Sequence, residues 1–511
     1  MGISRKASLL KTPDEVNQKP KMSAFKLIMS IIGIACMIFF RFIPPYSSIT
    51  SIGWAVIGDF VGAVILWTFV DLTWPFFPLV VFMGIDMLSI YPSSTQSAGV
   101  YEACMQSIGN WIPVFVIGCL IFCVLLEDSG ILRRISYFFI SRKLAHKGGW
   151  TFSIFLLASA LLCVLFLDVT PVQLFFFAIC EEIFLAFGFK KGDSWPKFII
   201  TSLTFVLVTG FVMTPICHTL SILWMGVYSS ISGNPSSILE YTMLAFPCGI
   251  ALLVLMLVWF RLVIKPDMSK FKTVDWSALD KLNPGPWTKR EKVVVVTLIV
   301  CLACWIVPGV VALIAPQSPF VDFMNNKLTQ IGPLFLAIAL MCIIHVDGKP
   351  VLNINDALSR VQWPTVILLA SFTLVANAIA EDACGINLWL TNVFTPLIQG
   401  LSPWTFVTVI GIICIVLTSF LNQVPVGIIL MNVSIPICMA NGINPLIMAI
   451  TICIGASMAF TIPPACLTVG IAYGNDWTKG SYILKNGTVL ALISIVLTWL
   501  ICYPLGTLLF G

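Results

Sequence analysis

The sequence predicts an all-α membrane protein with many spans, and three observations support this fold class. Of its 511 residues, 59% are hydrophobic and only 10% are charged, whereas a soluble protein carries about 25% charged residues. Long apolar runs recur along the whole chain. Short polar segments with proline interrupt some of them at matching places in two halves. The composition excludes a soluble enzyme, a disordered chain and a nucleic-acid-binding protein.

Apolar runs of spanning length are distributed over the entire chain. A helix needs about 20 residues to cross the hydrocarbon layer. Eleven runs meet this condition, at residues 24–44, 52–71, 73–91, 111–127, 199–228, 237–262, 293–314, 328–346, 363–383, 447–472 and 488–510. Two more stretches, 152–188 and 404–441, divide into arms of about 15 residues, each covering about 22 Å as a helix. We expect these stretches to be re-entrant hairpins.

The positions of the basic residues predict the orientation. Lys and Arg are concentrated in the cytoplasmic loops of membrane proteins. With the N-terminus in the cytoplasm, all of the 28 basic residues except Arg41 and Lys327 fall on the inner side, and the C-terminus lies outside. The polar segment 1–23 has no signal-peptide pattern. We therefore expect a multi-pass protein of the cell (inner) membrane, whose net charge of +5 reflects topology and not a nucleic-acid partner.

Two sequence patterns recur in the two halves. Residues 166–172 (FLDVTPV) resemble 420–426 (FLNQVPV), and 211–219 (FVMTPICHT) resemble 460–468 (FTIPPACLT). The first hairpin has both ends inside and the second has both ends outside, so the two halves form an inverted repeat. Proline in mid-membrane frees backbone groups, which are tolerated only inside protein or beside a water-filled cavity. Paired broken helices of this kind indicate the binding site of a secondary transporter.

Other classes of membrane protein fit the sequence less well. A channel should expose a polar stripe along several helices, whereas the polar residues here collect at two segments. A membrane enzyme needs a nucleophile and a base, or a metal cluster, in one region, and the sequence shows neither. An ATP-driven pump needs a Walker loop, which is also missing. We therefore predict a secondary active transporter that is not an enzyme and uses no organic cofactor.

Several segments resemble the divalent anion/sodium symporter family, which contains sodium–dicarboxylate and sodium–sulfate cotransporters. The similar segments are residues 54–91, 111–134 and 290–385, and the order of elements matches over nearly the whole chain. The resemblance implies a sodium-coupled carrier of a small organic anion, a di- or monocarboxylate. It also implies a homodimer and elevator-type alternating access. The segments 131–147 and 385–400 would then be in-plane arm helices.

The resemblance assigns candidate site residues as well. The family has Ser-Asn-Thr at each hairpin tip, where this chain has Asp168-Val169-Thr170 and Asn422-Gln423-Val424. The implied sodium ligands are Asp168, Gly210, Asn422, Gln423 and Ser457. The candidate substrate-binding residues are Asp168, Thr170, Pro171, Thr214, His218, Thr219, Asn422, Gln423, Pro425, Pro464 and Thr468.

Asp168 is the most informative of these residues, because an ionisable side chain at mid-membrane depth is costly. It could bind sodium, carry a proton, pair with a cationic substrate, or only hydrogen-bond the broken backbone. A proton-coupled transporter of an amino-acid-like or cationic solute, and an anion exchanger, therefore remain alternatives. His218 could contact substrate, relay a proton or pack as a neutral side chain. Neither hairpin holds a basic residue, so helix N-termini near Pro171 and Pro425 would have to attract an anion.

These predictions divide the chain into eight segments. They are a cytoplasmic tail (1–23), scaffold helices of the first repeat (24–130), an interfacial arm helix (131–150), the first half of a transport domain (151–262), a cytoplasmic loop (263–292), scaffold helices of the second repeat (293–384), an outer arm helix (385–403) and the second half of the transport domain (404–511).

Overall fold

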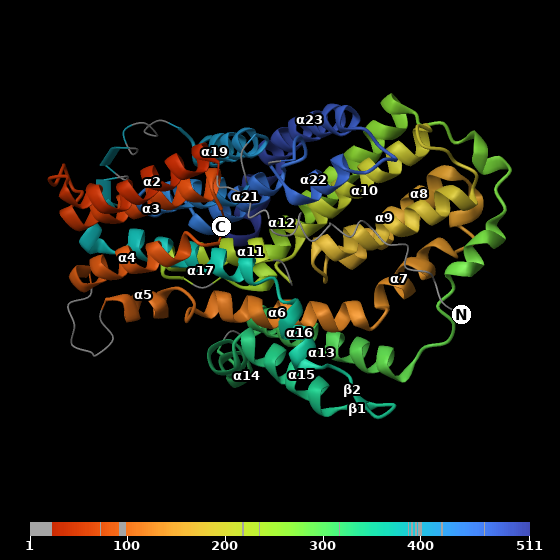
Figure 1. Ribbon diagram of the computed structural model, residues 1–511, viewed down its shortest axis with the longest axis horizontal. Coiled ribbons are helices and arrows are strands. Elements are labelled where there is room, and N and C mark those ends of the chain that lie inside the picture. The colour runs from red at the N-terminus through yellow and green to blue at the C-terminus, as the bar shows by residue number, and fades with distance from the viewer. Residues whose placement is uncertain are drawn as a thin grey trace.

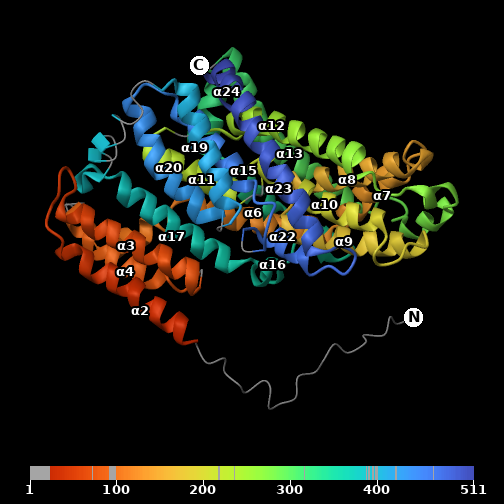
Figure 2. The same cartoon turned by 90° about the horizontal axis from the view of Figure 1, so that it is seen from above.

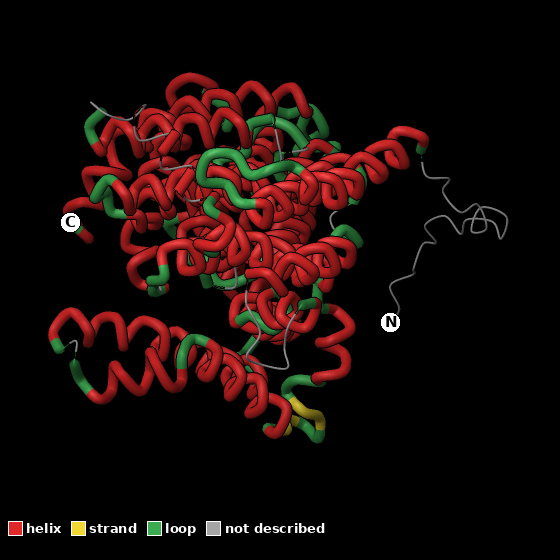
Figure 3. Tube along the Cα trace, turned by 90° about the vertical axis from the view of Figure 1, so that its left-hand side faces the viewer, coloured by secondary structure: helices red, strands yellow, loops and turns green. Residues whose placement is uncertain are grey.

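The computed structural model is almost entirely helical (Figure 3). It describes residues 23–71, 73–90, 99–216, 219–234, 236–315, 317–386, 388–389, 392–393, 396, 401–420, 423–463 and 465–511. Within these ranges the only sheet is a two-stranded hairpin, β1 (His345–Val346) and β2 (Lys349–Pro350). The predicted all-α, polytopic fold class is confirmed.

The first helices of the chain lie together at one end of the molecule, and α6 runs from there toward its middle (Figure 1). Its elements are α2 (Ala24–Phe39), η1 (Phe40–Phe42), α3 (Ser51–Phe69), α4 (Phe76–Ile90), α5 (Val100–Gln106) and α6 (Trp111–Asp128). Glycine allows α2 and α3 to pack closely, since a Cβ on Gly62 would lie 2.4 Å from the Gly33 carbonyl oxygen. The short helix α5 was not expected from the sequence.

The first hairpin follows a short amphipathic helix. The elements are α7 (Ile131–Ile140), η2 (Ala145–Lys147), α8 (Gly149–Val164), α9 (Val169–Ala186), α10 (Ser194–Met213), α11 (Thr219–Ser232) and α12 (Ile238–Trp259). Helices α8 and α9 are the two arms of the hairpin and both pack on α10. The chain breaks between α10 and α11, as the Thr214-Pro215 pair predicts.

The middle of the chain contains bent helices. Its elements are η3 (Phe260–Ile264), η4 (Ser269–Lys272), η5 (Trp276–Leu282), α13 (Lys289–Ile314), α14 (Pro319–Asp322), η6 (Phe323–Leu328), α15 (Ile331–Ile343), α16 (Ile354–Arg360), α17 (Trp363–Ala380) and η7 (Asp382–Cys384). The axes of α16 and α17 meet at 68°. Helix α17 contacts α3, α4 and α6 on one side and α11 and α20 on the other.

The C-terminal region repeats the order of the first hairpin region. Its elements are α19 (Pro403–Thr418), α20 (Gln423–Ala440), α21 (Pro445–Ser457), α22 (Leu467–Tyr473), α23 (Gly480–Leu497), η8 (Thr498–Cys502) and α24 (Tyr503–Phe510). The arms α19 and α20 pack on α21 as α8 and α9 pack on α10. In Figure 2 the two hairpins lie in different parts of the molecule, with α11 beside α20.

The two helices that precede the breaks form the centre of the fold. Every residue of α10 from Trp195 to Met213 is buried except Lys197. In α21, all residues from Leu446 to Ser457 are buried. A helix that is apolar on all sides must be covered by other helices, and the hairpin arms provide this cover.

Several helices differ in length from the spans that the sequence predicts. Among the described residues, seven helices are long and apolar enough to cross a membrane, or nine if each of two bent pairs is one span. The helices in the predicted runs 73–91 and 447–472 are shorter than a full span, since α4 has 15 residues and α21 has 13. The second arm of the first hairpin is longer than the expected 15 residues: α9 has 18 residues and meets the spanning criterion. Most of the predicted outer arm 385–400 lies outside the described residues.

Candidate functional site

The tip of the first hairpin is held by Asp168. This residue is the N-cap of α9, and its carboxylate accepts a 2.9 Å hydrogen bond from the Thr170 amide. The side chain is only 7% exposed. An N-cap carboxylate satisfies a free amide and complements the positive end of the helix dipole. Asp168 thus has a structural role in the tip, which was one of the roles left open by the sequence.

The break after α10 is seated on this hairpin. The Thr214 hydroxyl donates a 3.0 Å hydrogen bond to the Leu165 carbonyl oxygen, which lies at the end of α8. Four residues earlier, Gly210 lets α10 approach α8, because a Cβ there would lie 2.4 Å from Val164 Cγ1. The close packing of α10 against α8 thus explains why residue 210 is a glycine. Thr170 and Pro171 are half-buried at the start of α9.

The second half contains the corresponding arrangement. The Thr461 hydroxyl, in the break after α21, donates a hydrogen bond to the Ser419 carbonyl oxygen at the end of α19. The Tyr473 hydroxyl donates a 2.6 Å bond to the Thr461 carbonyl oxygen. Each hairpin is therefore attached to the helix break of its own half by a threonine hydroxyl. The pattern predicted the position of this break but not the role of Thr461.

The two halves are also joined to each other around the breaks. Gln173 Nε2, on α9, donates a 2.8 Å hydrogen bond to the carbonyl oxygen of Thr468 on α22. In the reciprocal place, α20 packs on α11, and a Cβ on Gly427 would lie 2.7 Å from Trp224 Nε1. The second arm of each hairpin thus contacts the short helix that follows the break of the other half.

Several buried oxygen atoms near the breaks have no hydrogen-bond partner in the described part of the chain. They are Thr209 Oγ1 on α10, Ser457 Oγ at the end of α21, Gln423 Oε1 at the start of α20, and Gln173 Oε1. A buried acceptor without a partner is unfavourable, so such atoms point to groups that bind a ligand or water. Of these, the sequence had singled out Gln423 and Ser457.

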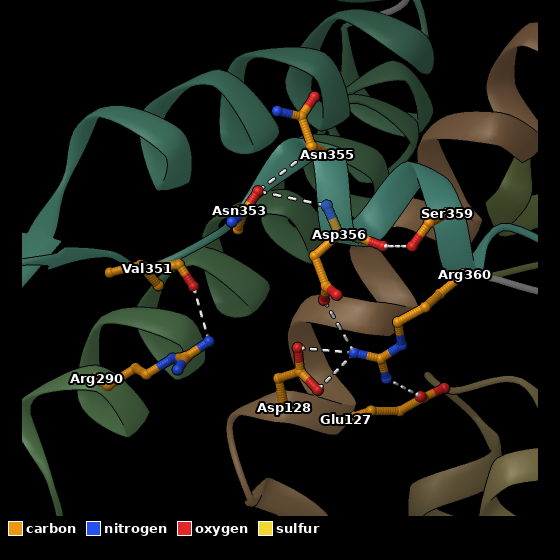
Figure 4. Close-up of polar contacts among 9 residues, drawn as sticks. All are labelled: Glu127, Asp128, Arg290, Val351, Asn353, Asn355, Asp356, Ser359 and Arg360. Atoms are coloured by element: carbon orange, nitrogen blue, oxygen red, sulfur yellow. Dashed lines mark hydrogen bonds and ion pairs between the residues drawn. The ribbon is translucent and has the colours of Figure 1, made fainter.

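A charged cluster joins α16 to the end of α6 (Figure 4). Arg360 Nη1 contacts the two Asp128 carboxylate oxygens at 2.8 and 2.9 Å, and Arg360 Nη2 contacts Glu127 at 3.1 Å. Asp356, one turn earlier on α16, lies 3.5 Å from Arg360. Through these ion pairs, the cluster joins the bend between α16 and α17, here called the corner, to the end of α6. At this corner, the Gln362 side chain faces the Asp168 carboxylate.

The remaining candidate residues are only partly described. His218, Asn422 and Pro464 lie outside the described residues, as do the side chains of Thr219 and Pro425. Thr468 is buried, and its carbonyl oxygen accepts the bond from Gln173. Gln173, Thr209 and Gln362 were missed because the sequence analysis concentrated on the two tip segments. A polar side chain in an otherwise apolar helix, as at Gln173, was the available signal.

Among the described residues, no group of three His, Cys, Asp or Glu side chains could hold a metal ion. Two cavities, of about 510 and 460 Å³, lie away from the hairpin tips. The first is beside α7 and the second is between α12, α13 and α24.

The fold and the site together define a polytopic membrane transport protein with two helical hairpins seated on two broken helices. The chain belongs to the family described as the sodium:sulfate symporter transmembrane region, whose model matches residues 23–511. The family predicted from the sequence is thereby confirmed.

Individual relatives are distant. A sodium-dependent dicarboxylate transporter of Staphylococcus saprophyticus is 22% identical over 409 residues, covering 77% of this chain and 76% of the relative. A citrate/succinate antiporter of Escherichia coli K12 is 25% identical over 223 residues, covering 43% and 39%. The crystal structure of the YdaH transporter of Alcanivorax borkumensis has a similar fold. Its TM-score is 0.51 at 14% identity, with 79% of this chain and 86% of that chain covered.

Proposed function

We propose that this protein is a sodium-coupled secondary active transporter of a small organic anion, a di- or monocarboxylate. The observation that carries the proposal is the matched seating of two hairpins on two helix breaks, through Thr214 and Leu165 in one half and through Thr461 and Ser419 in the other. Paired broken helices in inverted repeats bind substrate and coupling ions in secondary transporters. Two relatives that carry dicarboxylates or citrate by name support an anionic substrate.

The two tips favour different ligands. Helices α9 and α20 both begin at a tip, so each N-terminus can attract an anion. The N-terminus of α9 is already complemented by the Asp168 carboxylate, whereas α20 begins with the neutral Gln423. The substrate carboxylate therefore fits better against the second tip, and a cation fits better against the first.

Sodium is a suitable cation for the oxygen atoms present. The Asp168 carboxylate is buried. The hydroxyls of Thr209 and Ser457, near the ends of α10 and α21, have no hydrogen-bond partner among the residues that the structure describes. The carbonyl end of a broken helix carries partial negative charge and can coordinate sodium together with such oxygens. An ion there would also screen Asp168 from an anionic substrate. Asp168, Thr209 and Ser457 would hold sodium, and Gln423 would orient the substrate.

We further propose elevator-type alternating access by a homodimer in the cell (inner) membrane, with the N-terminus in the cytoplasm. In this scheme residues 151–262 and 404–511 move against the scaffold helices, and α7 joins the two parts. Asp168 lies beside Gln362 and close enough to Glu127 to interact electrostatically. The distribution of basic residues predicts that these ends of α6 and α17 face the cytoplasm, and this orientation would make the conformation inward-facing.

The test is uptake of radiolabelled succinate by purified protein in liposomes, with imposed sodium and proton gradients. The variant is Asp168→Asn, and the matched control is Asp280→Asn, an exposed residue of η5. We expect sodium-driven uptake that the control retains and that Asp168→Asn reduces at least tenfold. Uptake driven by protons alone would overturn sodium coupling. No succinate uptake under either gradient would overturn the proposed substrate class.

A further inference from the structure

A cavity of about 510 Å³ lies under the amphipathic helix α7, away from both hairpin tips. One wall is formed by α7, with Arg134 and Tyr137, and by Arg142, which follows the end of the helix. Another wall includes Leu162 of α8. The segment 283–287, which leads into α13, closes the remaining side. The volume is in the range of small-molecule binding pockets.

The charge of the cavity comes from one free arginine. Arg134 also lines it, but its guanidinium is paired with the Glu291 carboxylate at 2.8 and 2.7 Å. Arg142 is exposed, makes no ion pair among the described residues, and stacks on the Phe138 ring at 3.7 Å from its centroid. The lining contains no acidic residue. The cavity therefore carries about one uncompensated positive charge.

The surroundings of the cavity suit the surface of a membrane. Helix α7 buries Ile131, Leu132 and Ile140 against the protein, while Phe138 and Trp287 are 54% and 48% exposed. Trp and Tyr are enriched at the level of lipid headgroups, and the cavity is lined by both Trp287 and Tyr137. The cavity has both polar and apolar lining. Ser141 and Asn283 are among its polar residues, and Leu162 is among its apolar residues.

We propose that this cavity binds one anionic phospholipid from the leaflet in which α7 lies. Arg142 would bind the phosphate, since a guanidinium can donate two parallel hydrogen bonds to its oxygens. Basic pockets beside membrane helices bind acidic headgroups in this way. An acyl chain would lie along the apolar lining. The bound lipid would contact α7, α8 and the segment before α13 at the same time, and would therefore stabilise the packing of these three elements against one another.

The test measures binding of fluorescent phosphatidylglycerol to the full-length protein in a neutral detergent, with phosphatidylcholine as the uncharged comparison. We expect Arg142→Gln to weaken phosphatidylglycerol binding about fivefold. The neighbouring Lys143→Gln, which removes a charge outside the lining, should change it less than twofold. Ser141→Trp keeps Arg142 and fills the cavity, so it should also weaken binding.

Three results would overturn the proposal. One is equal affinity of the native protein and Arg142→Gln for phosphatidylglycerol. Another is equal binding of the two lipids by the native protein. The third is full displacement of the lipid by inorganic phosphate at millimolar concentration, which would indicate a site for free phosphate. None of these measurements depends on transport activity, so they remain informative if the proposed substrate is wrong.

Discussion

The Thr214 hydroxyl donates a 3.0 Å hydrogen bond to the Leu165 carbonyl oxygen, joining the break after α10 to the end of the first hairpin arm. The hydroxyl of Thr461 and the carbonyl of Ser419 make the same connection in the other half. All four residues are buried. A helix break exposes backbone groups that water cannot reach here, and these side-chain bonds compensate for part of that loss.

Removing either threonine hydroxyl should weaken the contact between a hairpin and the helix break of the same half. We expect Thr214→Val and Thr461→Val each to lower the free energy of unfolding by about 1 kcal/mol, because each leaves a buried carbonyl without its donor. The measurement is unfolding in detergent. The control is Thr242→Val, whose hydroxyl bonds to Ile238 within α12 and can be lost without separating two elements. A larger effect at Thr242 than at Thr214 would contradict the prediction.

The bond between Gln173 and Thr468 should be sensitive to the charge placed at position 173. Gln173→Leu removes the donor and should cost about 1 kcal/mol of unfolding free energy. Gln173→Glu places a carboxylate against the Thr468 carbonyl oxygen in a fully buried site, so it should cost more than Gln173→Leu. Both variants should be compared by unfolding and by the rate of succinate uptake. Native stability of Gln173→Leu would show that the amide donor has no role, and equal stability of the two variants would show that the buried charge adds no cost.

The contribution of the Arg360 cluster to the free energy of unfolding should depend on salt concentration. Arg360→Ala leaves Glu127 and Asp128 without their cation, and we expect a loss of about 1 kcal/mol at low ionic strength. The loss should shrink above about 0.5 M salt, because screening acts on partly exposed charges. Asp356→Asn should have a smaller effect, since its contact with Arg360 is 3.5 Å. Unfolding midpoints at two salt concentrations test this, and a salt-independent loss would indicate packing and not charge.

Low pH should weaken one contact at the end of the first hairpin region. The Lys270 ammonium, 2.7 Å from Asp193, holds the pKa of that carboxyl below its ordinary value of 3.8. A carboxyl with a lowered pKa stabilises the folded state above 3.8 and loses this contribution as the pH falls through the folded pKa. Lys270→Met should therefore reduce the unfolding midpoint at pH 6, and the difference from the native protein should disappear below pH 3.8. A difference that persists there would contradict an ionic origin.

Part of the site could be predicted from residue patterns. Prolines and polar residues in apolar runs located both hairpin tips and both breaks, because mid-membrane polar groups are costly and stand out against an apolar background. Thr214 was selected in this way. Thr209 and Gln173 lie within helices, and the contacts that make them informative come from residues as distant as Thr468. A single sequence does not show which of several polar residues in a helix faces such a partner.

The order of residues along the chain was enough to predict a helical protein that is embedded in a membrane, and repeated motifs predicted two related halves. These properties follow from hydrophobic content, run length and repeated motifs, which are local features. The tertiary structure alone decided that Asp168 caps α9, that Thr461 holds Ser419 and that Arg360 gathers the carboxylates at the end of α6. Each of these depends on which side chains meet after the helices pack. Many pairs of side chains could form contacts of similar energy, and the way in which the helices pack decides which pairs meet. These contacts are therefore identified only in the folded structure.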